Sequence, residues 1–323
     1  MNGVDLSVLY RGPLESCNYA CAYCPFAKKK DSRADLARDR AALERFVAWV
    51  GARTNDRVSV LFTPWGEGLV RSWYRDALVA LTQMPHVDKA AIQTNLSARL
   101  DFARDAVASK LGIWATFHPD WTTRDRFVAQ VARLVDLGAR VSCGVVAMRE
   151  NVREIELLRE ALPRAVYLWV NAAKSEARRS QDVYYTPELV ARLSAVDPLF
   201  EVNAADHPSA GASCRAGASV VSVDGDGDVR RCHFVREVIG NLYDGSFDAA
   251  LRERPCPNAT CGCHIGYVHL DRLELRATFE GGVLERIPAR WPAPPRAVAS
   301  RSAARRALPI ARAAGQSSRP DVR

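Results

Sequence analysis

The 323-residue sequence contains no apolar run of the roughly 18–20 residues that a membrane-spanning helix requires. Its first residues, Met-Asn-Gly-Val-Asp, also lack the basic segment and following apolar segment of a secretory signal peptide. These two absences argue against a membrane protein and against secretion. We therefore expect a cytoplasmic protein without a membrane partner.

The sequence has no excess of positive charge outside its last segment, although its formal net charge is +8. Nine of the 45 Lys and Arg residues but only one of the 37 Asp and Glu residues lie in 286–323, so the remainder is neutral. This distribution argues against nucleic acid as a partner. The 286–323 segment is rich in Ala, Pro, Arg and Ser and has too few apolar residues to bury a core, which predicts a disordered tail. A docking or nucleic-acid-binding arm is the alternative.

Six short apolar runs predict β-strands, and most of them are followed by segments with helical spacing of apolar residues. The runs are 6–10, 58–62, 89–93, 112–117, 141–146 and 166–170. The clearest helical segments are 36–50, 127–137 and 187–196, with Gly138 in a plausible C-terminal capping position. Repeated strand–helix units predict an α/β fold with a parallel sheet and right-handed crossovers. Periodicity alone leaves a barrel and an open sheet as alternatives.

Residues 200–285 follow a different pattern, rich in turns and cysteine. The Asp- and Gly-rich segment 224–228 separates Val-Ser-Val at 221–223 from Val-Arg-Arg at 229–231, and this arrangement predicts a β-hairpin with a tight turn. We expect a small Cys-rich α+β domain here instead of another strand–helix unit.

The first cysteine group, Cys17, Cys21 and Cys24, has the spacing C-x3-C-x2-C and directly follows the first predicted strand. The carboxyl ends of parallel strands are where active sites form in such folds. Three thiolates on one loop can hold three irons of a cubane and leave the fourth iron open for catalysis. A zinc site is the alternative, but it usually needs four ligands and no fourth one is obvious nearby.

This motif, in which the aromatic Tyr23 precedes the last cysteine, resembles the signature of the radical S-adenosylmethionine (radical SAM) superfamily. The resemblance implies that Cys17, Cys21 and Cys24 bind a [4Fe–4S] cluster whose open iron chelates S-adenosylmethionine. It further implies reductive cleavage of S-adenosylmethionine to a 5′-deoxyadenosyl radical, which removes a hydrogen atom from a substrate. Tyr23 would lie against the adenine, or it would only pack in the loop.

Three further segments follow predicted strands and fit the same pocket. Gly66 and Glu67 resemble part of the family's Gly-Gly-Glu-Pro motif, which contacts the methionine amino group, although Trp65 and Gly68 depart from that motif. The resemblance makes Asn95 another cofactor-binding candidate. His118 is a candidate catalytic acid or base on the substrate side, or a loop histidine.

The late cysteines suggest a second cluster. Cys214 and Cys232 have the spacing C-x12-G-x4-C, which resembles the start of the SPASM and twitch auxiliary-cluster domains of radical SAM enzymes. Cys256, Cys261 and Cys263 would supply the remaining ligands of a second, auxiliary [4Fe–4S] cluster, with one cysteine to spare. A zinc site that also uses His264 is the alternative. Arg230 and Arg231 place positive charge beside Cys232, which favours a reduced cluster, and a lone Cys143 inside a strand is expected to be buried.

These expectations combine into one hypothesis. Residues 1–199 form a partial (β/α)6 TIM-like barrel, residues 200–285 a twitch- or SPASM-like domain, and residues 286–323 a tail. The protein is expected to be a radical SAM enzyme that oxidises, crosslinks or otherwise modifies a peptide or small-molecule natural product, with ferredoxin or flavodoxin as electron donor. A tRNA-modifying enzyme and a non-catalytic iron–sulfur or zinc scaffold are the alternatives.

Overall fold

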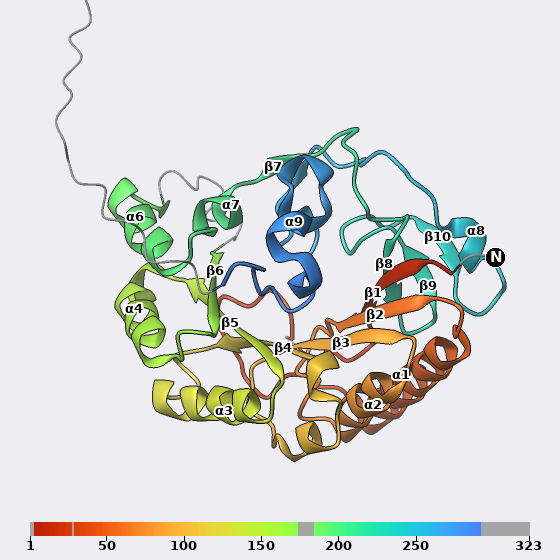
Figure 1. The fold of residues 1–323 in the computed structure, drawn as a ribbon, viewed down its shortest axis with the longest axis horizontal. Helices are drawn as coiled ribbons and strands as arrows, with labels where there is room; N and C mark the ends of the chain where they lie inside the picture. Colours follow the sequence, from red (N-terminus) through yellow and green to blue (C-terminus); the bar gives the residue numbers. More distant parts are fainter. Residues whose placement is uncertain (1–2, 28, 174–183, 292–323) are drawn as a thin grey trace, which may run out of the picture. The chain divides into compact units, whose positions relative to one another are not determined.

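One nine-stranded sheet forms the centre of the structure, a computed structural model that describes residues 3–27, 29–173 and 184–291. The strand order is β10-β9-β8-β1-β2-β3-β4-β5-β6 (Figure 1). The strands are β1 (Asp5–Arg11), β2 (Arg57–Phe62), β3 (Val87–Thr94), β4 (Leu111–Phe117), β5 (Arg140–Ala147), β6 (Tyr167–Ala172), β8 (Val220–Asp224), β9 (Asp228–Arg230) and β10 (Val238–Asn241). A separate two-stranded sheet pairs β7 (His207–Pro208) with β11 (Thr260–Cys261).

Strands β1 to β6 are all parallel, as the strand–helix alternation predicts. The six predicted strands are confirmed within a few residues at each end. The sheet curves but does not close, because β6 and β10 are its two edges. The α/β prediction is therefore confirmed, and the barrel is not closed, as a partial barrel requires.

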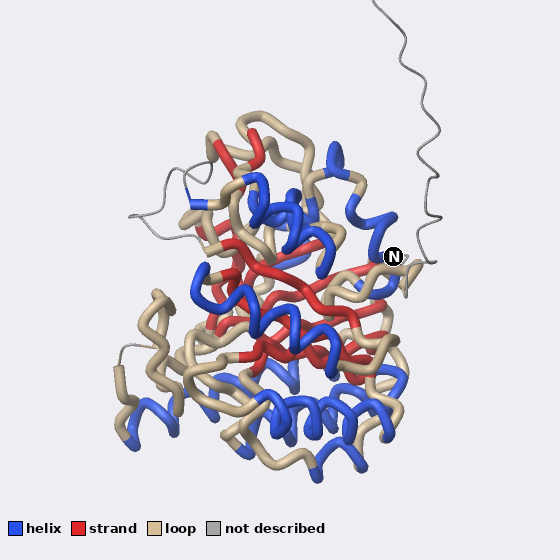
Figure 2. The backbone as a smooth tube through the Cα atoms, turned by 90° about the vertical axis from the view of Figure 1, so that its left-hand side faces the viewer, coloured by secondary structure: helices blue, strands red, loops and turns tan. Residues whose placement is uncertain are grey.

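Helices cover the outer face of this sheet, and the strands lie between them and the inner segments (Figure 2). These helices are α1 (Arg33–Ala52), α2 (Ser72–Gln83), α3 (Arg124–Asp136), α4 (Val152–Ala161), α6 (Pro187–Val196), α7 (Phe200–Ala204) and α8 (Phe247–Ala250), whereas α9 (Leu275–Phe279) lies on the inner face. Helix α1 begins at a capping box between Ser32 and Asp35, and Gly138 adopts φ +80° just after α3, as expected for a helix end.

The inner, concave face of the sheet is filled by the segment that contains α9 (Figure 1). Leu9, Leu61 and Trp114 of the sheet pack there against residues such as Tyr267 and Phe279. Both faces of the central strands are therefore covered, which explains why those strands are almost uniformly apolar. At the amino ends of the strands, buried Glu285 accepts hydrogen bonds from Lys89 and Arg140 and so fixes the end of this segment.

The cysteine-rich region continues the main sheet, because β8 pairs in parallel with β1. The predicted hairpin is confirmed as the antiparallel pair β8–β9. The predicted boundary at 199/200 falls between α6 and α7, inside the compact unit that comprises residues 1–292.

The prediction that a disordered tail starts at residue 286 is wrong for its first residues. Arg286 is only 1% exposed, and the Trp291 ring lies 4.9 Å from that of Tyr167. The aromatic rings of the inner face bind this segment although its composition is that of a tail. The prediction for residues 292–323 lies outside the described residues. None of the helices in the described ranges combines the length and the hydropathy needed to cross a membrane.

His269 gives the fold a testable pH dependence. It is 2% exposed, and neither ring nitrogen has a hydrogen-bond partner. Burial lowers its pKa from 6.5 to about 3, with smaller contributions from Arg286 and Arg276. A histidine with a lowered folded-state pKa contributes stability above the unfolded pKa, and this stability is lost as the pH falls below 6.5.

We expect His269→Phe to remove this dependence. Between pH 7 and pH 5 the wild-type protein should lose about 2 kcal/mol more free energy of unfolding than the variant, measured by urea denaturation. The other histidines are common to both proteins and cancel in the comparison. Parallel stability curves for the two proteins over this range would contradict the assignment.

Candidate functional site

The first cysteine loop begins at the carboxyl end of β1 and is held in place before it reaches Cys17. The Asp31 carboxylate accepts hydrogen bonds from the Ser16 amide (2.8 Å) and the Ser16 hydroxyl (2.7 Å). Buried Asp39, on α1, accepts a hydrogen bond from the Leu14 amide at 3.1 Å. The main chain that leads into the cysteines is therefore fixed by two carboxylates.

The Gly66–Glu67 turn after β2 holds the same segment from the other side. The Gly66 amide donates to the Leu14 carbonyl, and the Glu67 amide donates to the Ser16 carbonyl, both at 3.1 Å. A Cβ atom on Gly66 would lie 2.0 Å from the Ser16 carbonyl oxygen. The close contact between these two loops therefore requires glycine at this position.

The Glu67 side chain joins the ends of β2 and β3. It is 3% exposed and accepts from the Thr94 hydroxyl (2.6 Å), the Asn95 amide (2.6 Å) and the Leu69 amide (3.0 Å). Burial raises its pKa, and these hydrogen bonds oppose the shift. Both carboxylate oxygens of Glu67 therefore already accept hydrogen bonds from other residues of the protein.

Asn95 connects this network to the first cysteine. Its side-chain amide donates to the Asn18 carbonyl oxygen at 3.0 Å and lies 3.7 Å from the Cys17 sulfur. The Tyr19 amide donates to the same sulfur at 3.3 Å. Two N–H groups therefore face Cys17, an arrangement that suits a thiolate.

His118, at the end of β4, contacts the same loop. Its Nδ1 atom lies 2.6 Å from the Tyr23 hydroxyl oxygen and 3.3 Å from the Cys21 sulfur. The rings of Tyr23 and His118 are parallel within 7°, with centroids 6.0 Å apart, and Tyr19 packs against the edge of the imidazole. Burial lowers the pKa of His118 to about 4. The structure thus brings His118, Tyr23 and Cys21 together.

The three early thiols are electrostatically coupled. Burial raises the pKa of Cys17, and burial raises that of Cys21 to about 11; the charge of Cys24 adds to both shifts. The described residues contain no disulfide. Within them, no three His, Cys, Asp or Glu side chains converge closely enough to share a single metal ion. In an iron–sulfur cubane each thiolate binds a different iron, so the three coupled thiols fit that group.

The late cysteines form a second coupled group. Burial raises the pKa of Cys214, Cys232 and Cys263, and it raises that of Cys261 to about 12. The charges of Cys232 and Cys256 contribute to the shift of Cys214, and those of Cys263, Cys232 and Cys214 contribute to the shift of Cys261. Thiols gathered in this way and not oxidised to disulfides fit a bound metal cluster, whose binding would release their protons. Cys143, by contrast, is fully buried within β5, as predicted.

Arg11 lies between the two cysteine groups and was not predicted as a functional residue. It ends β1 and occupies the same strand face as Leu9, which points into the inner core. Its Nε donates to the Thr63 carbonyl at 2.9 Å, and its guanidinium lies 4.2 Å from the centroid of the Trp65 ring. Burial lowers the pKa of Arg11 to about 10, while the charge of Cys263 raises it. Its position at the end of the first predicted strand, on the face that points inward, is the feature of the sequence that could have identified Arg11 as a functional residue.

Asp39 was also missed. It is fully buried on the same face of α1 as Leu43, Phe46 and Val50, where the periodicity alone predicts apolar residues. A carboxylate within an apolar helical stripe is therefore the signal that could have identified it. The Trp73 indole N–H donates to it at 2.7 Å.

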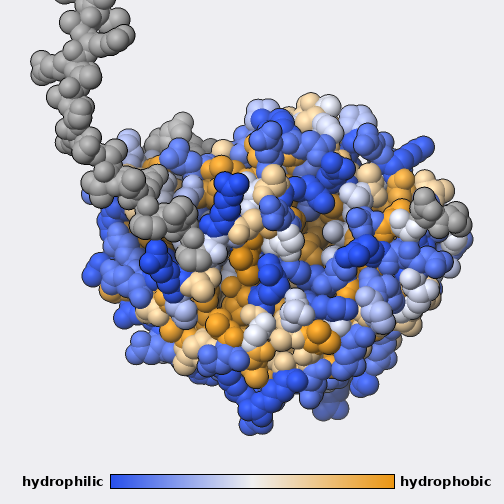
Figure 3. Space-filling view, viewed as in Figure 1, coloured by the Kyte–Doolittle hydropathy of each residue, from blue (hydrophilic) through white to orange (hydrophobic). Residues whose placement is uncertain are grey.

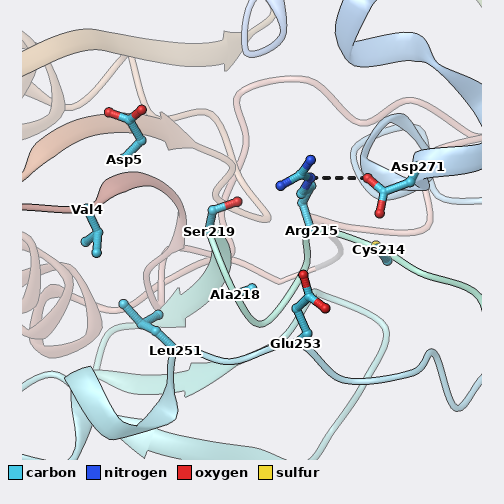
Figure 4. Close-up of a pocket in the computed structure, with 9 residues that line it drawn as sticks. All are labelled: Val4, Asp5, Cys214, Arg215, Ala218, Ser219, Leu251, Glu253 and Asp271. Atoms are coloured by element: carbon cyan, nitrogen blue, oxygen red, sulfur yellow. Dashed lines mark hydrogen bonds and ion pairs between the residues drawn. The ribbon is translucent and has the colours of Figure 1, made fainter.

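Apolar surface collects in the middle of one face, inside a hydrophilic rim (Figure 3). A cavity of about 340 Å³ lies at the amino ends of β1 and β8 (Figure 4). Cys214, Ser219 and the ion pair of Arg215 with Asp271 line it. This cavity is at the opposite end of the strands from the Cys17 loop, and Cys214 is the cysteine that lines it.

Gly66→Ala tests the contact between the two loops. We expect the added methyl group to displace the Ser16 main chain and to lower the free energy of unfolding by about 2–3 kcal/mol, measured by urea denaturation. Gly281→Ala is the matched control, because no atom lies within 4 Å of a Cβ there, and it should change stability by less than about 1 kcal/mol. Equal effects of the two substitutions would show that the loops do not need this close contact.

Comparisons with known proteins indicate the fold. No protein-family model and no curated protein sequence matches the chain. Among solved structures, SuiB from Streptococcus suis is 14% identical over 78% of this chain and 66% of its own, with a TM-score of 0.50. A structure of anSMEcpe with bound AdoMet and Cp18Cys peptide is 16% identical over 75% of this chain and 79% of its own (TM-score 0.48). BtrN in complex with AdoMet and 2-DOIA is 16% identical over 76% and 81% (TM-score 0.39).

At such identities the likeness concerns the fold alone, and of the three matches described above, that to SuiB has a TM-score of 0.50. The shared architecture is the mostly parallel sheet with its helices on the outer face. The chain therefore shares an α/β fold with SuiB, as the alternation of strands and helices in its sequence predicts.

Proposed function

We propose that this chain is a radical SAM enzyme whose Cys17, Cys21 and Cys24 bind a [4Fe–4S] cluster. The observation that carries the proposal is that these three coupled thiols occupy one loop, fixed at the carboxyl end of β1. A three-thiolate site leaves one iron without a protein ligand. When bound, the cluster supplies the electron that cleaves S-adenosylmethionine into methionine and a 5′-deoxyadenosyl radical.

The surrounding residues have supporting roles in this proposal. Glu67 already accepts three hydrogen bonds from the protein, so its part is to hold the loops after β2 and β3 in register. Asn95 donates toward Cys17 and would stabilise its thiolate. Gly66 brings the β2 loop against the cysteine loop.

His118 is best described as a positioning residue. Its single Nδ1 atom contacts both Cys21 and Tyr23, and its ring is stacked on that of Tyr23. These contacts hold His118 against the cysteine loop. We therefore propose that it orients Cys21 and Tyr23, in place of the substrate-side acid or base role expected from the sequence.

Exposed aromatic rings near the cysteine loop favour a peptide or another ligand with apolar surface as substrate. Phe26 and Trp65 are 39% and 37% exposed, with ring centroids 4.4 Å apart. Trp121, 43% exposed, stacks on Tyr19 at 5.4 Å. These residues belong to loops after β1, β2 and β4, at the edge of the sheet that carries Cys17. Such rings bind extended apolar groups without a large loss of side-chain entropy.

The late cysteines are proposed to hold an auxiliary [4Fe–4S] cluster, and ferredoxin or flavodoxin is proposed as the electron donor. The support is the mutual coupling of Cys214, Cys232, Cys261 and Cys263 in a buried setting. The tRNA-modifying alternative loses part of its basis, because Arg286 is buried and cannot contact RNA.

The decisive assay measures 5′-deoxyadenosine. The anaerobically reconstituted protein, given S-adenosylmethionine and dithionite, should form the nucleoside, and the Cys17→Ala/Cys21→Ala/Cys24→Ala variant should not. Cys143→Ala is the matched control, since Cys143 belongs to neither group, and it should retain activity. His118→Gln should bind less iron than wild type if it positions Cys21. A wild-type protein loaded with iron that forms no nucleoside, even with substrate-containing extract, would favour the scaffold alternative.

A further inference from the structure

Three arginines that are buried or partly buried near the segments of the late cysteines have no carboxylate partner among the residues that the structure describes. Arg231 is 3% exposed and Arg286 1% exposed, while Arg11 is partly buried at the end of β1. None of the three takes part in an ion pair within the described ranges. The carboxylate nearest to Arg286 in sequence, Glu285, is engaged with Lys89 and Arg140. Buried cations without a counter-ion are costly, so a structure that keeps three of them requires an anion nearby.

Two of the three arginines, Arg231 and Arg286, are hydrogen-bonded to segments that carry late cysteines. Arg231 precedes Cys232 and donates to the carbonyl of Pro255, the residue before Cys256. It therefore links two of the cysteine segments. One of its terminal nitrogens, Nη2, has no hydrogen-bond partner although it is buried.

Arg286 reaches the segment that follows Cys263. Its Nη2 donates to the carbonyls of His264 at 2.9 Å and Ile265 at 3.3 Å. The guanidinium lies 5.0 Å from the centroid of the Trp114 ring and 5.9 Å from that of Trp169. These rings exclude water from the cation, and its Nε is left without a partner.

The charges of these arginines and of the cysteines act on one another. The charges of Arg11 and Arg286 both lower the pKa of Cys263, against the larger effect of burial. The charge of Arg231 acts in the same direction on Cys214 and Cys232. Arg231 is bonded to the carbonyl before Cys256, and Arg286 is bonded to the two carbonyls that follow Cys263. These contacts point to the late cysteines, as thiolates of a bound cluster, as the source of the missing anion.

We propose that Arg11, Arg231 and Arg286 are the counter-ions of the auxiliary cluster and raise its reduction potential. This inference rests on the proposed auxiliary cluster. A four-cysteine [4Fe–4S] cluster is an anion that becomes more negative when it takes up one electron. Three cations in a site of low dielectric constant stabilise the reduced form more than the oxidised form. The positive charge of Arg231 beside Cys232 is thus one part of a larger arrangement.

The test is a redox titration of the auxiliary cluster, followed by electron paramagnetic resonance. It is carried out on the full-length holoprotein and on the Cys17→Ala/Cys21→Ala/Cys24→Ala variant, whose only cluster signal comes from the late cysteines. Arg11→Gln is introduced into both, because Arg11 is the least buried of the three. At the midpoint potential of the parent protein, the ratio of reduced to oxidised cluster in Arg11→Gln should be at least tenfold lower than in the parent. This change corresponds to a reduction potential lowered by about 59 mV for a one-electron couple.

Two variants separate charge from packing. Arg11→Lys keeps the charge, so the reduction potential of its auxiliary cluster should stay close to that of the parent protein. Arg286→Gln removes a charge and should lower the reduction potential, as Arg11→Gln does. Arg57→Gln is the matched control, because Arg57 is exposed at the amino end of β2 and pairs with Asp88 of β3. This substitution should leave the reduction potential of the cluster unchanged.

Unchanged potentials in Arg11→Gln and Arg286→Gln, with iron content equal to the parent, would overturn the counter-ion role and leave the proposed function intact. Equal shifts in Arg11→Lys and Arg11→Gln would also overturn it, because the charge would then not be the cause. Zinc, or no metal, at the late cysteines would refute the auxiliary cluster and this inference together, while nucleoside formation would still report on the radical SAM assignment.

Discussion

The parallel pairing of β8 with β1 is the constraint on which the rest of the structure depends. Its register, from Ser7 opposite Val220 to Arg11 opposite Asp224, places the chain of the late cysteines beside the strand that leads to Cys17. Two groups separated by almost 200 residues of sequence are thereby attached to neighbouring strands of one sheet. Arg11, the last residue of β1, lies between them as a direct result.

The inner face of the sheet determines the chemistry that these groups can perform. The segment around α9 fills that face toward the amino ends of the strands, where Glu285 is fixed by Lys89 and Arg140. The filled interior leaves the carboxyl edge, with the Cys17 loop and its aromatic neighbours, as the place where we propose that cofactor and substrate bind. Radical chemistry needs such exclusion of water, because a reactive intermediate must meet only its substrate.

Much of the fold could be predicted from the sequence, because strands covered on both faces are long apolar runs and the helices between them have strong periodicity. The cysteine spacing likewise predicts which thiols act together. The pairing of β8 with β1 could not be predicted, since strand order depends on contacts between distant segments. Arg286 was assigned to a tail because composition does not reveal the aromatic rings of Trp114 and Trp169 that bind it. Asp39 was hidden for a similar reason, as its acceptor role depends on the loop at Leu14.

The central claim is that the chain holds two separate iron–sulfur clusters, one for each cysteine group. Counting iron after anaerobic reconstitution tests it most directly, in the wild type and in variants that replace either group with alanine. The account predicts about eight irons per wild-type chain and about four in each variant. About four irons in the wild type, unchanged when the late cysteines are replaced, would contradict it.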